Sequence, residues 1–247
     1  MKLILLRHGE SQWNLENRFT GWKDVPLAQS GIIEAQYAAE KLIEMEIAFN
    51  SIYTSFLLRA THTAEIVAKS LKFDHNKIIK DWRLNERHYG DLQGLNKSET
   101  ASKYGEKQVH IWRRSFDTPP PMLPKDDSRY KEVENTYKRL NVSNAIKGES
   151  LKNVIDRLNP FWQKYYSNIM KIRGNHIIVA HSNSLRAIIK ILDNLSDQEI
   201  MSVNIPTGIP LVYTFNQGNK IINKKYLINE SELIKKQKII ENQGKKK

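Results

Sequence analysis

Short apolar runs alternate along the chain with longer segments in which apolar residues recur every three or four positions. The short runs are typical of buried strands, and the longer segments predict amphipathic helices. Strands are expected at 2–6, 51–54 and 176–180, and helices at 32–45, 60–71, 151–158 and 184–192. Because strands that alternate with helices form a mostly parallel sheet covered on both faces, the pattern predicts an α/β fold.

The C-terminal part of the chain predicts an antiparallel hairpin. Residues 211–215 and 220–228 have the character of strands, and a Gln-Gly-Asn turn at 217–219 separates them. Ser196 and Glu199 have the spacing of a capping box, which predicts one more short helix before the hairpin.

Prolines and polar stretches predict the irregular parts. Pro160 is expected to bend or interrupt the helix at 151–158, because proline removes a backbone donor. Residues 118–142 contain four prolines and a run of charges, and they predict a long excursion over the surface that could serve as a lid. Residues 241–247 predict a flexible polar tail, and residues 1–247 otherwise predict a single domain.

Composition and charge narrow the classes of function. Among 247 residues, 39 Lys and Arg outnumber 27 Asp and Glu, for a formal net charge of +12. This excess favours an anionic partner such as nucleic acid, a membrane surface or a phosphorylated metabolite, although compositional drift would also produce it. The absence of cysteine excludes disulfides, thiolate metal sites and cysteine nucleophiles. No apolar run approaches the roughly 18 residues that span a bilayer, so a soluble, cytoplasmic protein is expected.

Two of the predicted strands are each followed directly by a histidine. The first leads into Arg-His-Gly-Glu at 7–10, and a later one leads into His-Ser-Asn at 181–183. Ligands of parallel sheets bind beyond the carboxyl ends of the strands, so His8 and His181 are expected to face one pocket. Taken singly, each could instead be a buried structural histidine.

Arginines accompany the two histidines along the chain. Arg7 adjoins His8, Arg59 begins a predicted helix, and Arg113 and Arg114 form a pair. Guanidinium groups bind phosphate and carboxylate in a bidentate manner. Histidine beside arginines, without metal-ligand spacing or a phosphate-binding loop, indicates phosphoryl transfer onto imidazole.

Glu86 lies in the segment Arg-Leu-Asn-Glu-Arg-His-Tyr-Gly at 83–90. A glutamate among cations can be an ion-pair partner, or it can act as a general acid and base in a partly desolvated pocket. Spacing alone leaves both interpretations open.

These segments together resemble the cofactor-dependent phosphoglycerate mutases of the histidine phosphatase superfamily. The resemblance covers nearly the whole chain and rests on residues 6–14, 19–22, 55–60, 85–90, 94–97, 112–115, 148–151, 181–187 and 204–211. It implies the fold of that family, which is a single-domain, three-layer α/β sandwich with a central, mostly parallel mixed sheet and helices on both faces.

The resemblance also implies the chemistry. An enzyme of this family interconverts 3-phosphoglycerate and 2-phosphoglycerate through a phosphohistidine, here on His8, primed by 2,3-bisphosphoglycerate and without a metal ion. Glu86 would relay a proton, and Arg7, Arg59, His181 and Asn14 would surround the phosphoryl oxygens. The remaining substrate-binding residues implied are Ser11, Thr20, Gly21, Arg87, His88, Tyr89, Lys97, Arg113, Arg114, Ser182 and Asn183.

Partners follow from the resemblance alone. They are small-molecule phosphoglycerates and further copies of the chain in a dimer or tetramer, with neither nucleic acid nor a membrane as partner. Two alternatives remain: a phosphatase or bisphosphoglycerate synthase/phosphatase that uses the same His8, and a basic, non-catalytic binder of nucleic acid. Ser11 favours the mutase, because the bisphosphoglycerate enzymes have glycine there. The dispersed lysines and the absence of a nucleic-acid module disfavour the binder.

Ser182 departs from the family pattern, which has glycine after the second histidine. Glycine permits a left-handed backbone or close approach to a ligand, so serine is expected to lower activity without abolishing it. If the backbone there is ordinary, the substitution changes nothing. Residues 130–144 also match the family less closely.

Overall fold

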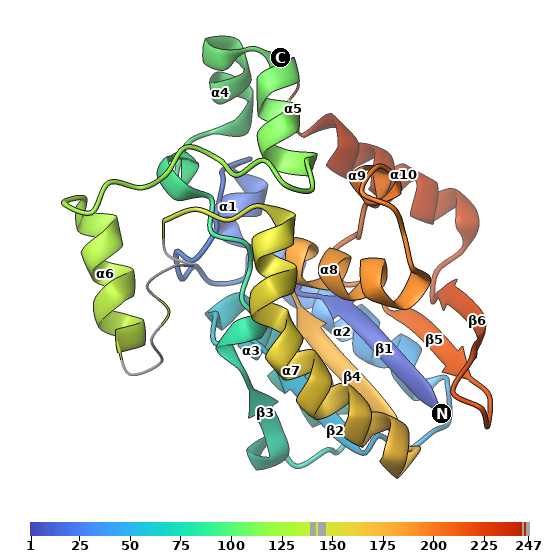
Figure 1. Cartoon of the computed structure of the whole chain (residues 1–247). Helices are drawn as coiled ribbons and strands as arrows, with labels where there is room; N and C mark the ends of the chain where they lie inside the picture. Colours follow the sequence, from blue (N-terminus) through green and yellow to red (C-terminus); the bar gives the residue numbers. More distant parts are fainter. Residues whose placement is uncertain (139–141, 143–146, 244, 246–247) are drawn as a thin grey trace.

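A six-stranded mixed sheet forms the centre of the computed structural model, which describes residues 1–138, 142, 147–243 and 245 (Figure 1). The strand order is β3-β2-β4-β1-β5-β6. The strands are β1 (Lys2–Arg7), β2 (Ser51–Thr54), β3 (Ile78–Lys80), β4 (Asn175–Ala180), β5 (Leu211–Phe215) and β6 (Ile221–Tyr226). Strands β1 to β4 pair in parallel, whereas β5 is antiparallel to β1 and β6. The predicted mostly parallel sheet and the terminal hairpin are both confirmed.

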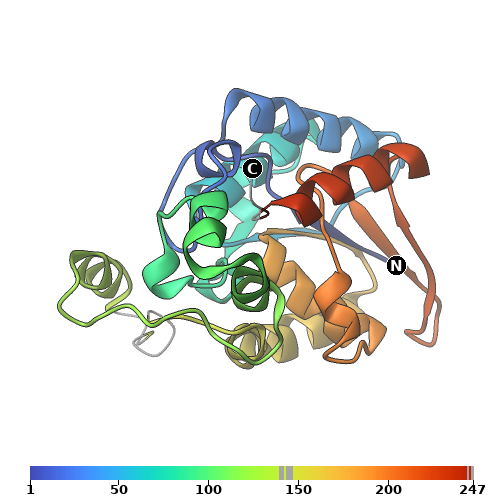
Figure 2. The same ribbon diagram turned by 90° about the horizontal axis from the view of Figure 1, so that it is seen from above.

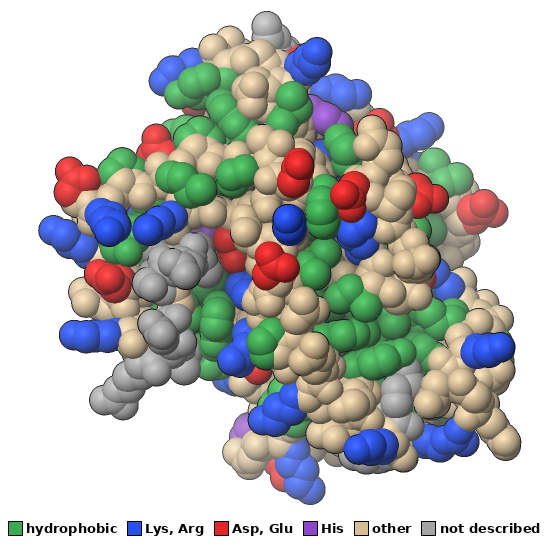
Figure 3. All heavy atoms as spheres, viewed as in Figure 1, with side chains coloured by type: hydrophobic (Ala, Val, Ile, Leu, Met, Phe, Trp, Pro, Cys, Tyr) green, Lys and Arg blue, Asp and Glu red, His purple; other side chains and the backbone are tan. Residues whose placement is uncertain are grey.

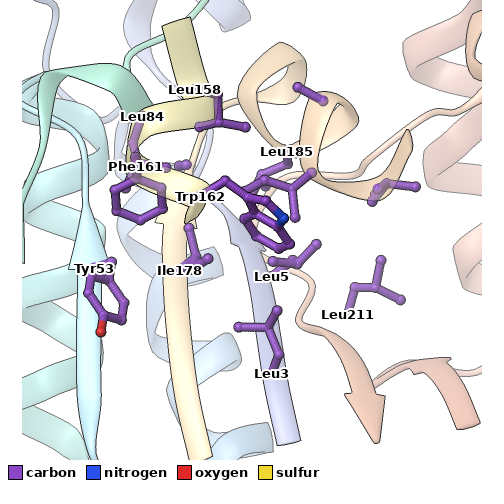
Figure 4. Close-up of a cluster of buried hydrophobic side chains, with 14 of the residues drawn as sticks. Leu3, Leu5, Tyr53, Leu84, Leu158, Phe161, Trp162, Ile178, Leu185 and Leu211 are labelled. Atoms are coloured by element: carbon purple, nitrogen blue, oxygen red, sulfur yellow. The ribbon is translucent and has the colours of Figure 1, made fainter. Parts of the chain in front are cut away.

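Alternate residues of β1 bury opposite faces of the sheet, as the two-residue period of a strand requires. Ile4 and Leu6 pack under α2 (Gln29–Ile43) and α3 (Leu58–Ser70). Leu3 and Leu5 pack under α7 (Leu151–Ile172) and α8 (Ser182–Asp193), where Figure 4 shows them beside Trp162 and Leu185. The sheet therefore lies between two helical layers, which are visible from above in Figure 2.

The other helices lie around the edges of this sandwich. They are α1 (Gln12–Leu15), α4 (Lys97–Tyr104), α5 (Glu106–Arg114), α6 (Ser128–Tyr137), α9 (Glu199–Ser202) and α10 (Glu230–Asn242), with 3-10 turns at His75–Lys77, Trp82–Leu84 and Gly90–Leu92. Helices α1, α4 and α5 stand beyond the carboxyl ends of the parallel strands (Figure 1). Among the residues that the structure describes, no helix has both the length and the apolar character of a membrane span.

The predicted surface excursion at 118–142 contains helix α6, so the prediction of an irregular segment was wrong over this stretch. Tyr130, Val133 and Tyr137 are buried and pack with Trp22. Their spacing of three and four residues gives α6 an apolar face, which the interspersed charges obscure in the sequence. The rest of the poorly matching segment, at 139–141 and 143–144, lies outside the described residues.

Helix α7 runs through Pro160, so the predicted interruption was wrong, whereas a bend at Pro160 stays a prediction. Proline removes one internal hydrogen bond, but Leu158 and Phe161 are fully buried on either side of it. Burial of both halves of the helix against the sheet outweighs the lost bond. The capping box is confirmed, since the Ser196 and Glu199 side chains each accept a hydrogen bond from the other residue's backbone N–H.

Candidate active site

The carboxyl ends of β1 and β4 meet, because the two strands are adjacent and in parallel register. The backbone N–H of His8 donates to the carbonyl of Ala180 at 3.0 Å, which continues the strand pairing by one residue. The ring centroids of His8 and His181 consequently lie 4.8 Å apart. The two histidines that follow the predicted strands share one site.

His8 is held in a single tautomer. Its Nδ1 lies 2.7 Å from the carbonyl oxygen of Gly9, and a carbonyl can only accept, so Nδ1 carries the hydrogen. Nε2 is therefore the nitrogen with a free lone pair. Burial lowers the pKa of His8 well below its usual value, and the charges of Arg59 and Arg7 lower it further. His8 is thus a neutral imidazole at physiological pH, which is the nucleophilic form.

His181 lies behind His8 and is also neutral. Burial, followed by the charge of Arg59, lowers its pKa well below the usual value. Its Nε2 is 2.8 Å from Oγ of Ser55, whereas its buried Nδ1 has no hydrogen-bond partner within the described chain. If the Ser55 hydroxyl donates to Nε2, then Nδ1–H remains free to donate to an anion bound at His8.

A pocket opens in front of His8 and is dominated by basic groups. Its walls are formed by Arg7, His8, Asn14, Arg18, Phe19, Thr20, Gly21, Arg59, Glu86, Tyr89, Lys97, Arg113, Arg114, Ser182, Asn183, Ile240 and Gln243. Within the described chain, Arg18 is the only basic wall residue with an ion pair, which it forms with exposed Glu16. The remaining cations point to a ligand with several negative charges.

Neutral groups hold these cations in place. Arg7 donates to the carbonyl of Ile205 at 2.7 Å, and Arg59 donates to that of Gly21 at 2.8 Å. Burial lowers the pKa of Arg59 to about 10 and that of Arg113 to about 9. Burial, followed by the charge of Arg113, also lowers the pKa of Lys97 well below its usual value. An anion that restored the missing counter-charge would therefore bind strongly.

Glu86 is the one acidic residue among the described residues of the wall, and it is only 8% exposed. Its Oε1 accepts from the backbone N–H of Arg87 at 2.7 Å, from that of Asn183 at 3.1 Å and from Asn183 Nδ2 at 3.0 Å. No described donor forms a hydrogen bond to Oε2. The carboxylate therefore presents one occupied and one available oxygen.

The end of helix α10 forms part of the wall. Gln243 Oε1 accepts from Lys97 Nζ at 3.3 Å, and the carbonyl of Ile240 accepts from Arg113 at 3.4 Å. Helix α10 has no buried residues and runs toward the centre of the molecule in Figure 2. Of the predicted tail at 241–247, residues 244, 246 and 247 lie outside the described residues.

Most of the residues implied by the resemblance reach the pocket, and four do not line it. Ser11 is fully buried and caps α1, and His181 lies behind His8. Arg87 stacks on Tyr89 at 4.6 Å. His88 packs on Trp22, and its Nδ1 accepts from the backbone N–H of Gly90. Direct substrate contact by Ser11, Arg87 and His88 stays a prediction.

Sequence reasoning missed four residues of the wall. Phe19 lies in the segment 19–22 that was already singled out, and Arg18 directly precedes that segment, so sequence position could have identified both. Ile240 and Gln243 lie far along the chain, and only the packing of α10 brings them to the site.

Ser182 lines the pocket as the first residue of α8, and its φ is not among the positive values found in the described chain. The left-handed strain considered for this serine is therefore absent. Ser182 lies at the N-terminus of α8, where backbone N–H groups favour an anion.

A sequence model of the histidine phosphatase superfamily (branch 1) matches residues 3–226, and the chain belongs to that superfamily. Among curated proteins, the chain is 48% identical over 247 residues to a 2,3-bisphosphoglycerate-dependent phosphoglycerate mutase from Treponema denticola, with all of both chains covered.

Solved structures of low identity share the fold. A mycobacterial glucosyl-3-phosphoglycerate phosphatase in complex with VO3 has a TM-score of 0.69 and 21% identity, over 92% of this chain and 98% of that chain. The protein YhfR of Bacillus stearothermophilus has a TM-score of 0.64 and 24% identity, over 89% and 93%. Both likenesses confirm the predicted α/β architecture.

Proposed function

We propose that this chain interconverts 3-phosphoglycerate and 2-phosphoglycerate through a phosphohistidine on His8, after priming by 2,3-bisphosphoglycerate. The observation that carries the proposal is a neutral His8 with a free Nε2, in a pocket that combines largely unpaired cations with a single carboxylate. The full-length similarity to a mutase of that name supports it. A ligand that bears two phosphates and a carboxylate fits these cations.

His8 and Glu86 would carry out the two halves of each transfer. In the primed enzyme, Oε2 of Glu86 removes the proton from the free hydroxyl of 3-phosphoglycerate, and this oxygen attacks the phosphorus on His8 as the bond from phosphorus to Nε2 breaks. After the resulting bisphosphoglycerate has turned around, Nε2 of His8 attacks its other phosphorus, the bond from that phosphorus to the sugar-acid oxygen breaks, and Glu86 returns its proton to that oxygen. Positioned acid–base groups of this kind contribute about 10²–10⁴-fold in rate.

The cations would divide into two groups. Arg7 and Arg59, with Nδ1–H of His181, stabilise the negative charge spread over the oxygens of the transferred group. Lys97, Arg113 and Arg114 would hold the carboxylate and the second phosphate at the opposite wall. Because the walls are preorganised by neutral contacts, little rearrangement is needed during transfer.

The end of α10 would exclude water while the intermediate turns around in the pocket. Its weak contacts to Lys97 and Arg113 can be exchanged for ligand contacts.

We further propose a cytoplasmic homo-oligomer, a dimer or tetramer, that acts on small phosphoglycerates. Figure 3 supports action on a small molecule rather than binding of nucleic acid, because the Lys and Arg side chains on the face that it shows are dispersed, with Asp and Glu side chains between them.

An assay that couples 2-phosphoglycerate formation to a downstream enzyme tests the function, with release of inorganic phosphate measured in parallel. We expect turnover of 3-phosphoglycerate that depends on 2,3-bisphosphoglycerate, with slow phosphate release. Phosphate release as fast as isomerisation would favour the phosphatase, and absence of isomerisation by primed enzyme would contradict the mutase.

A further inference from the structure

Arg186 is a buried cation that the mechanism above does not use. It lies in α8, is 1% exposed, and among the described residues its guanidinium donates only to neutral oxygens, of Asn183, Arg114 and Ile200. Burial, followed by the charges of Arg114 and Arg87, lowers its pKa well below the usual value. A buried charge without a counter-ion lowers stability, and its hydrogen bonds offset only part of that cost, so its presence here calls for an explanation.

The contacts of Arg186 orient the side chain of Asn183. Nη1 donates to Oδ1 of Asn183 at 2.9 Å, and Nη2 donates to the carbonyl of Ile200 at 2.7 Å. A guanidinium group has donors only, so it selects the oxygen of the amide and turns the nitrogen away. Arg186, which only donates, and the Glu86 carboxylate, which only accepts, therefore select the same orientation of this amide.

The nitrogen of Asn183 then serves two groups of the site. Nδ2 donates to Oε1 of Glu86 at 3.0 Å and to Oη of Tyr89 at 3.2 Å. Together with the backbone N–H groups of Arg87 and Asn183, this places three donors on Oε1. Because the Tyr89 oxygen accepts, its own hydrogen is free to be donated to a ligand in the pocket.

We propose that Arg186 is a positioning residue that acts through Asn183. By orienting the Asn183 amide, it keeps Oε2 of Glu86 available for proton transfer and leaves the hydroxyl hydrogen of Tyr89 available to the ligand. This inference rests on the proposed function. With Arg186 absent, Oδ1 of Asn183 loses the donor that holds it, and the amide can rotate away from Oε1 of Glu86. Oε1 would then lose one of its three donors, so the carboxylate would leave its productive position.

A double-mutant cycle on Arg186 and Asn183 tests the inference. We expect Arg186→Met to lower kcat about 10- to 100-fold, as a misplaced catalytic group does, with KM changed less than threefold. Asn183→Ala should lower kcat by a similar factor. The double variant should be no slower than Asn183→Ala alone, because Arg186 acts only through Asn183. Multiplicative losses in kcat would overturn the proposal.

Two further variants separate positioning from stability. Arg186→Lys keeps one donor toward Asn183 and should retain most of kcat, even if Arg186→Met fails to fold. Arg173→Met removes an exposed arginine at the far end of α7 and should leave kcat unchanged. If Arg186→Lys is as slow as Asn183→Ala with an unchanged melting temperature, the proposal is wrong. Inactive wild-type protein would contradict the proposed function instead.

Discussion

Nδ1 of His8 donates to the carbonyl oxygen of Gly9 over 2.7 Å, and this bond between neighbouring residues determines which ring nitrogen can react. It leaves the lone pair on Nε2, in a residue that is only 2% exposed. The backbone at the end of strand β1 thus leaves Nε2 of His8, the nucleophile that we propose, without a hydrogen.

Removal of the imidazole should abolish formation of the phosphoenzyme. Incubation with 2,3-bisphosphoglycerate should place an acid-labile phosphoryl group on the peptide that contains His8, and His8→Ala should acquire none. Mass spectrometry under alkaline conditions measures the adduct. Native-rate exchange by His8→Ala would exclude this role.

Glu86→Gln keeps the shape of the side chain and removes its proton transfer. We expect kcat to fall by about 10²–10⁴-fold with a small change in KM. Steady-state kinetics in the coupled assay measure both values. A loss of less than about threefold in a folded variant would assign the relay to another group.

Deletion of residues 241–247 should affect the reaction more than the fold. Helix α10 buries no residue, so the melting temperature should change by only a few degrees. Loss of the contact between Gln243 and Lys97 opens the pocket to water. The ratio of mutase to phosphatase turnover should therefore fall, and an equal ratio in both proteins would show that the tail has no such role.

Ser182→Gly should not accelerate the enzyme. Ser182 begins α8 and has no positive φ to relieve, so glycine offers no gain of conformational freedom there. We expect kcat to stay within about threefold and stability to fall by up to about 1 kcal/mol. A clear rise in kcat would mean that serine hinders the backbone or the ligand.

His176 should make stability depend on pH. It is buried beside Ser51, away from the pocket, and burial lowers its pKa to about 4. The unfolded chain takes up this proton near pH 6.5, so stability decreases as the pH falls from about 6.5 to 4. The decrease from this group amounts to at most about 3 kcal/mol. Urea unfolding of the wild type and His176→Gln across this range measures it, and parallel pH curves would contradict the assignment.

The sequence by itself determined five strands of the sheet, the helices that cover it and the two histidines of the site, but it did not predict the short edge strand β3. Strand periodicity and the position of His8 and His181 directly after β1 and β4 are local properties, and parallel strands bring their carboxyl ends to one edge. The resemblance to the phosphoglycerate mutases then identified most of the residues that line the pocket, including Glu86, Lys97 and Arg113.

Only the tertiary structure decided how these groups are oriented. That Gln243 meets Lys97 depends on where α10 packs, which no spacing reveals. That Arg186 selects the oxygen of Asn183, and so leaves Oε2 of Glu86 available, depends on which atoms face each other in a buried network. A sequence pattern records residue types, whereas hydrogen-bond direction is determined by the packing of elements far apart in the chain.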